Sequence, residues 1–523
     1  MNRIATIAAA ILAVAPLALS DAIAQVPQRQ DPLPPAQGQG TGPAQPDDHH
    51  RTPPATDPLA KPVEFIRGLF GSDPTYPDTP YDANAQIQIY GGKTRFDGPR
   101  PILEWGYPVY GDGPIGAGHN VIGEKNLVRP QLLVYGDWRT AVAYNDNKNT
   151  EAGQIATRLN IDVDLKLTAT ERIHAFFRPV DKGGKFSRYE FFGDDRQRGD
   201  RIFDGNLETL FFEGDVGAIV AGLKDDYVGF DLPFSFGLVP LLFQNGTWVD
   251  DAFIGGAFAI PARNSPMLDI SNFDISFFAG TDKVTTLALK DATGQLDDRA
   301  GRVFGVATFT EMRSGYLEAG YGYLDDTRDL GPSGFDYHSL TAAWTQRYGG
   351  WLSNSIRGIH AFGQSPDRGL RETADGWVLI AENSLVTSLP STLIPYGNFF
   401  LGNNRPQPLA RGGDGVLKNV GISFETDALT GFPKLNDTAQ DAFGGAIGLQ
   451  YLFALDQQLI FEVATVQPRG GSSDDIVGDQ YGFSIRYQMN LDDRWIFRTD
   501  AIYARQLDDI DSRGIRFELR RKF

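Results

Sequence analysis

Several basic side chains stand at the polar positions of segments in which apolar and polar residues alternate. Guanidinium and ammonium groups bind carboxylates and other anions without any covalent chemistry. Two acidic residues, Asp500 and Glu518, occupy equivalent positions among them, so the pattern also fits a surface of mixed charge held by salt bridges. Both interpretations stay open at this point, and the candidate binding residues are Arg178, Arg486, Arg498, Arg516, Arg520 and Lys522.

Residues suited to covalent catalysis do not form a recognisable pattern. Nucleophilic hydrolysis needs a Ser or Cys beside a His and an orienting carboxylate. The chain has six His and no Cys, and no serine stands in a G-x-S-x-G context. Phosphate-binding loops and cysteine-based metal sites are also missing from the sequence. We therefore predict that the chain is not an enzyme, with no catalytic residues, no metal and no cofactor.

The elements that position the basic residues are β-strands with one apolar and one polar face. Residues 159–167 read LNIDVDLKL, in which each odd residue is apolar and each even residue is polar. A period of two is that of a strand. We therefore predict an all-β chain, because the rhythm returns at 447–453, 459–463, 481–490, 495–503 and 514–523.

The last of these segments separates two architectures. A soluble β-sandwich also has strands with one apolar face, but chain ends usually fray. Here Phe523 falls on the same side of the alternation as Ile515, Phe517 and Leu519. In this respect the sequence resembles the Gram-negative outer-membrane protein class, whose last strand typically ends in Phe and is read by the barrel-assembly machinery.

This resemblance covers a short motif and the overall rhythm, so it identifies a class and no single family. It implies a transmembrane β-barrel surrounded by outer-membrane lipid and lipopolysaccharide. It also implies that Phe523 is the residue by which the assembly machinery recognises the chain.

Connections between the predicted strands alternate in length, as they do in barrels with short periplasmic turns and long external loops. We predict a single transmembrane antiparallel barrel over 126–523 with about 18 strands, in a range of roughly 16 to 20. Short turns are expected near 214–215, 312–315, 348–350, 389–392, 455–456 and 491–493, and long loops at 193–206, 325–334, 403–443 and 469–480.

One apolar stretch falls where this rhythm requires an external loop. Residues 227–246 read YVGFDLPFSFGLVPLLFQNG, and an exposed loop of this composition would be a costly apolar patch. The stretch therefore folds into the lumen as a constriction, docks on the barrel rim or supplies another strand. The constriction candidates are Phe230, Phe234, Phe236, Leu242 and Phe243.

The N-terminal part has a different organisation. Residues 1–24 have a basic start, an apolar run and the site Ala22-Ile23-Ala24, which is the order of a signal peptide cleaved near Ala24. Residues 25–62 are rich in Pro, Gln and Gly, which predicts a disordered periplasmic linker. Residues 63–125 form an N-terminal segment without a clear pattern, in which 86–90 alternates as a first strand would.

Composition restricts the partners. A net charge of −18 and a pI near 4.8 argue against nucleic acid, because phosphate binding needs a basic surface. The mean hydropathy of −0.27 suits a barrel, since only alternate residues of each strand face lipid. Strand faces look alike along the chain, so no flank is singled out as an oligomer interface.

Together these patterns predict a channel in the outer membrane of a Gram-negative bacterium, for passive or substrate-selective transport of small hydrophilic solutes. Anionic solutes are expected if the basic residues cluster, because rings of charge set pore selectivity. Two alternatives fit the same rhythm: a barrel that exports a polysaccharide or other polymer, and a plugged barrel with a structural or adhesive role. Conduction through the lumen separates them.

Overall fold

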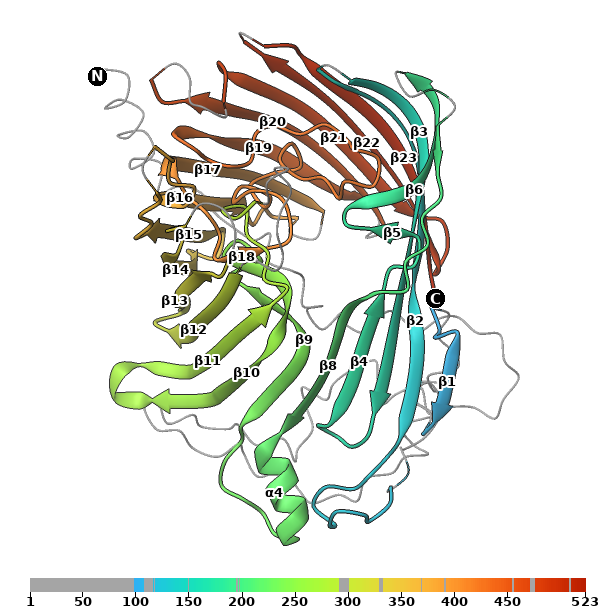
Figure 1. Ribbon diagram of the computed structural model, residues 1–523, viewed down its shortest axis with the longest axis vertical. Helices are drawn as coiled ribbons and strands as arrows, with labels where there is room; N and C mark the ends of the chain where they lie inside the picture. Colours follow the sequence, from blue (N-terminus) through green and yellow to red (C-terminus); the bar gives the residue numbers. More distant parts are fainter. Residues whose placement is uncertain are drawn as a thin grey trace, which may run out of the picture.

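Antiparallel hydrogen-bonded pairs join each wall strand to the next one along the chain, and the last strand pairs with the first (Figure 1). The architecture is that of a closed barrel of 18 strands, as predicted. The computed structural model describes residues 98–107, 116, 118–148, 150–193, 196, 198–290, 301–328, 333–367, 369–389, 392–453, 456–470, 476–507 and 509–523. The predicted signal peptide, the predicted linker and the strand-like stretch at 86–90 lie outside these residues.

The first half of the wall contains two composite strands. β4 and β6 both pair with β3 and together make one wall strand, while β7 and β8 make the next. The bounds are β1 (Leu103–Gly106), β2 (Gln131–Asn147), β3 (Thr150–Lys166), β4 (Arg172–Phe177), β5 (Asp181–Lys182), β6 (Lys185–Gly193), β7 (Gly199–Asp200), β8 (Leu207–Asp215), α4 (Val216–Lys224), β9 (Pro233–Phe243), β10 (Val249–Ser265), the short 3-10 turn η2 (Pro266–Leu268) and β11 (Ile270–Asp282).

The second half is a simple meander, apart from the two-residue β18 in the long connection after β17. Its strands are β12 (Gly301–Met312), β13 (Gly315–Asp326), β14 (Tyr337–Tyr348), β15 (Leu352–Phe362), β16 (Asp375–Leu385), β17 (Leu393–Arg405), β18 (Ala410–Arg411), β19 (Ala442–Phe453), β20 (Gln457–Pro468), β21 (Gln480–Asn490), β22 (Trp495–Gln506) and β23 (Ser512–Lys522).

The seam between β2 and β23 closes the barrel. It runs from Asp137 opposite Lys522 to Asn147 opposite Ser512. Phe523 extends the seam, because its N–H donates to the Gly136 carbonyl at 3.0 Å and its carbonyl accepts from the Gly136 N–H at 2.8 Å. Beyond that point β1 takes over as the neighbour of β2.

The alternation read from the sequence gives the wall two different faces. Phe461, Phe483 and Phe517 stay exposed on the outside, whereas inward-facing residues such as Asp500 and Arg516 are buried. An apolar outer face with polar groups inside is the arrangement of a transmembrane barrel. Among the described residues, no helix combines the length and the apolar character that a membrane crossing would need.

The two ends of the barrel differ. The chain enters β2 and leaves β23 at one end, the turn end, which carries short connections such as 313–314 and 491–494. The opposite loop end carries the long connections, including 406–441. The predicted turn at 214–215 is an exception, because β8 leads there into helix α4. The Asp215 side chain caps this helix, accepting from the Ala218 N–H at 2.9 Å.

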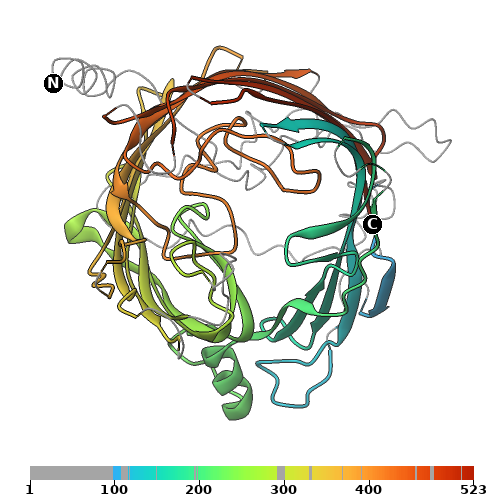
Figure 2. The same ribbon diagram turned by 45° about the horizontal axis from the view of Figure 1, so that its top comes forward.

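Among the described residues, at least three segments leave the wall and lie inside the barrel, as Figure 2 shows for the ring seen from its loop end. The first is the short hairpin around β5, and the second is the tip of the β9–β10 hairpin, residues 239–253, which extends beyond the pairing of β9 with β8 and of β10 with β11. The third is the connection 406–441, which we call the inner loop. It contains β18, which pairs with the start of β10.

The stretch 227–246 combines two of the three arrangements that its sequence allowed, a wall strand and an inward-folded segment. Residues 233–238 are a wall strand, and residues from 239 onward belong to the inward hairpin tip. Phe243 packs there against Phe278, with ring centroids 5.3 Å apart. Of the other constriction candidates, Leu242 lies in the hairpin tip but is largely exposed, and Phe230 is in the α4–β9 connection. Phe234 and Phe236 stack on each other in the wall, with the Phe212 ring tilted against both.

The hairpin tip builds an apolar core inside one side of the barrel. Trp248 is fully buried and donates from Nε1 to the Ser339 hydroxyl at 3.0 Å. Gly320 in β13 makes room for its ring, because a Cβ there would lie 2.6 Å from Trp248 Cζ3. Residues of the inner loop, among them Leu409, Val416 and Leu417, complete the same core.

Gly320→Ala should lower the free energy of unfolding by roughly 1–3 kcal/mol, because the added methyl group must displace a rigid indole in a packed core. The measurement is the guanidinium midpoint of the detergent-solubilised protein. Gly358→Ala is the matched control, since a Cβ at Gly358 would meet only the Val378 carbonyl at 3.9 Å. Equal midpoints for the two variants would contradict this packing.

Candidate functional site

Three of the predicted basic residues converge on one carboxylate of the inner wall. Asp500 in β22 accepts from Arg486 Nε at 2.7 Å, from Arg498 Nε at 2.8 Å and from Arg516 Nη2 at 2.8 Å. The strand register produces this arrangement, because Arg486, Asp500 and Arg516 are direct neighbours across β21, β22 and β23. The sequence pattern had indicated these residues without showing that they meet.

A second row of arginines crosses the seam. Arg520 in β23 stands directly opposite Arg139 in β2, which stands directly opposite Arg158 in β3. Like charges at directly paired positions destabilise a sheet. Arg520 is compensated by Asp137, with both contacts at 3.0 Å, and Arg139 by a two-point contact with Glu518 at 3.1 and 2.7 Å.

Arg158 is less fully compensated than the other arginines in this row. Its Nε lies 3.7 Å from Asp181 Oδ2, beyond hydrogen-bond distance, and makes no hydrogen bond in the structure. Asp181 sits on the inward hairpin at β5, where it also lies 3.7 Å from Arg178 Nη1. Burial is the main cause that raises the pKa of Asp181, with Arg178 and Arg158 opposing it.

Arg178 and Lys522 lie at the margins of this charged strip. Arg178 follows β4, forms an ion pair with Glu208 and joins the strip through Asp181. Lys522 pairs in register with Asp137 at the turn end. We use the term arginine strip for the residues Arg139, Arg158, Arg486, Arg498, Arg516 and Arg520.

The inner loop brings two further carboxylates to the strip. Asp427 binds Arg516 Nη1 at 2.8 Å and also binds Arg139, while Glu425 binds Arg486 Nη1 at 3.2 Å. Burial by itself would raise the pKa of Asp427, but Arg516 and Arg139 outweigh it and hold that pKa well below its usual range. Asp427 is therefore ionised at neutral pH.

The inner loop is fixed to the wall on both sides of Asp427. Before it, the buried carboxylate of Glu462 accepts from the Ile422 N–H at 2.9 Å, from the Ser423 N–H at 2.7 Å and from the Tyr396 hydroxyl at 2.5 Å. After it, the Thr430 carbonyl accepts from the side-chain amides of Asn145 in β2 and Gln154 in β3.

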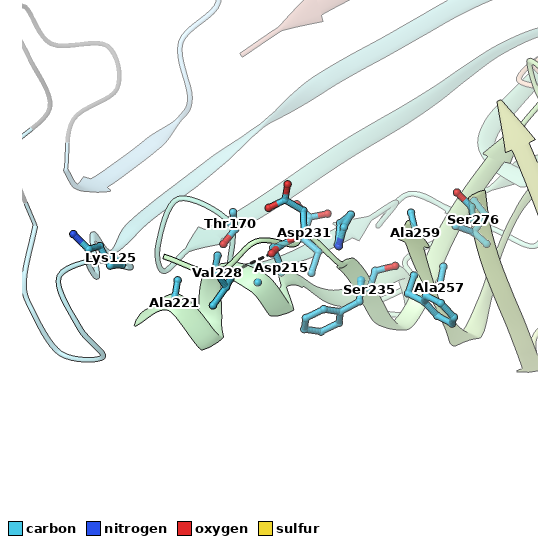
Figure 3. A pocket seen from close by; sticks show the side chains of 18 of the residues that line it. Lys125, Thr170, Asp215, Ala221, Val228, Asp231, Ser235, Ala257, Ala259 and Ser276 are labelled. Atoms are coloured by element: carbon cyan, nitrogen blue, oxygen red, sulfur yellow. Dashed lines mark hydrogen bonds between the residues drawn. The ribbon is translucent and has the colours of Figure 1, made fainter. Parts of the chain in front are cut away.

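A separate cavity of about 770 Å³ lies at the turn end, beside α4 (Figure 3). Ser235, Ala257 and Ser276 line it from the inner faces of β9, β10 and β11. Its charged lining residues are Lys125, Glu213, Asp215 and Asp231. Its wall is mainly apolar, and it lies away from the arginine strip.

The sequence pattern did not indicate the remaining residues of the site. Arg139 and Arg158 stand at the polar positions of two alternating strands, so strand parity could have found them. Asp427, Glu425 and Asp181 sit in connections, where neither period nor spacing shows which way a side chain points. The described part of the chain has no group of three or more His, Cys, Asp or Glu that could hold a metal ion.

Comparisons with known proteins give structural likeness only. No protein-family model matches the chain, and no curated protein matches it in sequence. Among solved structures, OccK1 (OpdK) of Pseudomonas aeruginosa is 12% identical with a TM-score of 0.48, covering 75% of this chain and 98% of that one. OccAB4 of Acinetobacter baumannii is 10% identical with a TM-score of 0.47, covering 75% and 98%.

Glu462→Ala should release residues 422–423 from the wall, because three donors lose one charged acceptor. Hydrogen bonds to charged groups contribute about 1.5–3 kcal/mol each, so trypsin should cut at Lys418 or Lys434 roughly tenfold faster or more. Mass spectrometry of timed digests measures this. Glu311→Ala, which removes a carboxylate at the turn end, is the control, and equal cleavage in both variants would contradict the anchoring role.

Proposed function

We propose that the chain is an outer-membrane channel for small hydrophilic solutes, with a preference for anions. The observation that carries the proposal is the arginine strip on the inner wall of a closed barrel. A lumen of 18 strands is wider than wall side chains alone can fill. The strip keeps one side of this lumen charged, whereas the inward segments fill the other side with an apolar core.

The outer face supports membrane insertion. Exposed Phe and Ile side chains on β20, β21 and β23 would be unfavourable in water and are favourable against lipid. Closure through β2 and β23 pairs the backbone groups that an open edge would expose to hydrocarbon. By analogy with bacterial barrels, the turn end faces the periplasm and the loop end faces the outside. Recognition of Phe523 by the assembly machinery belongs to the same proposal.

Anion preference follows from the balance of charge on the wall itself. The six arginines of the strip outnumber their carboxylate partners on the wall strands, Asp137, Asp500 and Glu518. Asp427 and Glu425 come from the inner loop, and Asp181 comes from the β5 hairpin. A strip of this kind attracts anions, since charge lining a narrow pore sets its selectivity. The alternatives, polymer export and a plugged structural or adhesive barrel, each predict a different conductance.

Purified protein refolded into a planar lipid bilayer should give steady current steps, and a KCl gradient should give a reversal potential of the sign expected for chloride preference. If protein shown to be folded and inserted gives no current steps, a plugged barrel is favoured instead. Large conductance without ion preference would favour a polymer exporter.

Arg158→Gln should reduce the ratio of anion to cation permeability by about twofold, because one unit charge at roughly 8 Å in water contributes about 0.5 kcal/mol. Arg158 is chosen because its ion pair is the longest in the row, so its loss disturbs the wall least. Arg313→Gln in the β12–β13 turn is the control with the same loss of charge. A reversal potential that moves equally in both variants would refute a role for the strip.

A further inference from the structure

The inner loop places a single carboxylate between arginines of the first and last wall strands. One oxygen of Asp427 contacts Arg516 Nη1 at 2.8 Å, and the other contacts Arg139. A free carboxylate could be bound by these two guanidinium groups in the same way, because the contact uses only the carboxylate oxygens.

Arg516 and Arg139 each have a carboxylate partner on the wall in addition to Asp427. Arg516 Nη2 also binds Asp500 at 2.8 Å, and Arg139 also binds Glu518 at 2.7 Å. Removing a carboxylate is costly where it leaves a buried charge unpaired. Displacing the Asp427 carboxylate leaves neither arginine without a wall partner, so another anion can replace it without disrupting the wall.

Asp427 is also more exposed than the two wall carboxylates that bind the same arginines. Its side chain is 20% exposed, compared with 6% for Asp500 and 4% for Glu518. Ala428 beside it is exposed as well. A solute in the lumen can therefore reach the Asp427 carboxylate, whereas Arg516 behind it is only 2% exposed and becomes accessible when that carboxylate moves.

The anchors of the inner loop confine movement to a few residues. Ser423 and Thr430 are bound to the wall on either side, and Phe424 and Leu429 are buried. Glu425 is also held, by Arg486, so residues 426–428 are the part of the loop that must move for the Asp427 carboxylate to leave the arginines. Displacement of the carboxylate therefore does not require the loop to leave the barrel.

From this geometry we propose that Asp427 is a tethered competitor that sets the specificity of the channel. Its carboxylate occupies the binding position for the carboxylate group of a small organic acid, and a solute passes the strip by displacing it. This inference rests on the channel function proposed above and adds the chemical class of the solute, a monocarboxylate, and the residue with which it competes.

The first test compares three proteins in planar bilayers under a KCl gradient: the wild type, Asp427→Asn and Asp414→Asn. Asp414 is the matched control because it lies in the same loop with similar exposure, 19%, and its partners Lys434 and Lys418 belong to the loop itself. Asp427→Asn should raise the ratio of anion to cation permeability by about two- to threefold, and Asp414→Asn should leave it near the wild-type value.

The second test replaces chloride by acetate. In the wild type, rising acetate should shorten the closed intervals of single channels, because the ion competes with Asp427. Asp427→Asn should lose this dependence and Asp427→Glu should restore it, which a purely structural role of the residue would not produce. Heat-modifiable migration in gels verifies that each variant is folded.

The outcomes separate the two proposals. Conducting wild type with the same selectivity and acetate response in Asp427→Asn would overturn the competitor role and leave the channel function standing. Silence of all folded variants would overturn the channel function, and the competitor role with it. A change of equal size in Asp414→Asn would show that loop charge in general, and not this position, is responsible, which would also overturn the proposal.

Discussion

Closure of the sheet is the constraint on which the other features depend. A strand edge cannot be left unpaired in hydrocarbon, so β2 and β23 must meet, and the terminal Phe523 completes their pairing through Gly136. The same register then fixes the order of charges inside the barrel. Arg520, Arg139 and Arg158 stand side by side only because the last wall strand, β23, and the first two, β2 and β3, pair in this register.

The interior is divided between two kinds of packing. On one side the hairpin tip at Trp248 and the inner loop bury apolar side chains against β12 to β17, as a soluble core would. On the other side the strip is held by ion pairs between wall and loop. The inner loop takes part in both, which explains how a connection of this length holds a defined path.

Sequence could predict the position of residues in regular strands, but not of residues in the connections between them. Alternation in segments such as 159–167 predicted the barrel, its number of strands and the inward orientation of Arg486, Arg498 and Arg516. The side of a strand on which a residue lies follows from the local alternation, so it can be predicted without knowledge of the fold. The position of Asp427 is not local, because its partners lie on strands far away in the chain.

The stretch 227–246 shows the same limit from another side. Its composition excluded an exposed loop, yet it could not show that a continuous strand leaves the wall halfway along β9. That departure depends on space in the interior, which Gly320 provides on a strand four positions further along the wall. No property of the stretch itself carries this information.

The path of the inner loop also bears on the order in which the molecule assembles. Its tip binds Arg139, Asn145 and Gln154 near the start of the wall and Arg516 near its end. These partners are brought together only when the seam has formed, and contacts between such distant parts of a chain form late because of the entropy of closing long loops. Docking of the tip is thus a kinetic marker of completed closure. The lumen acquires its final shape only after the last strand has paired with the first.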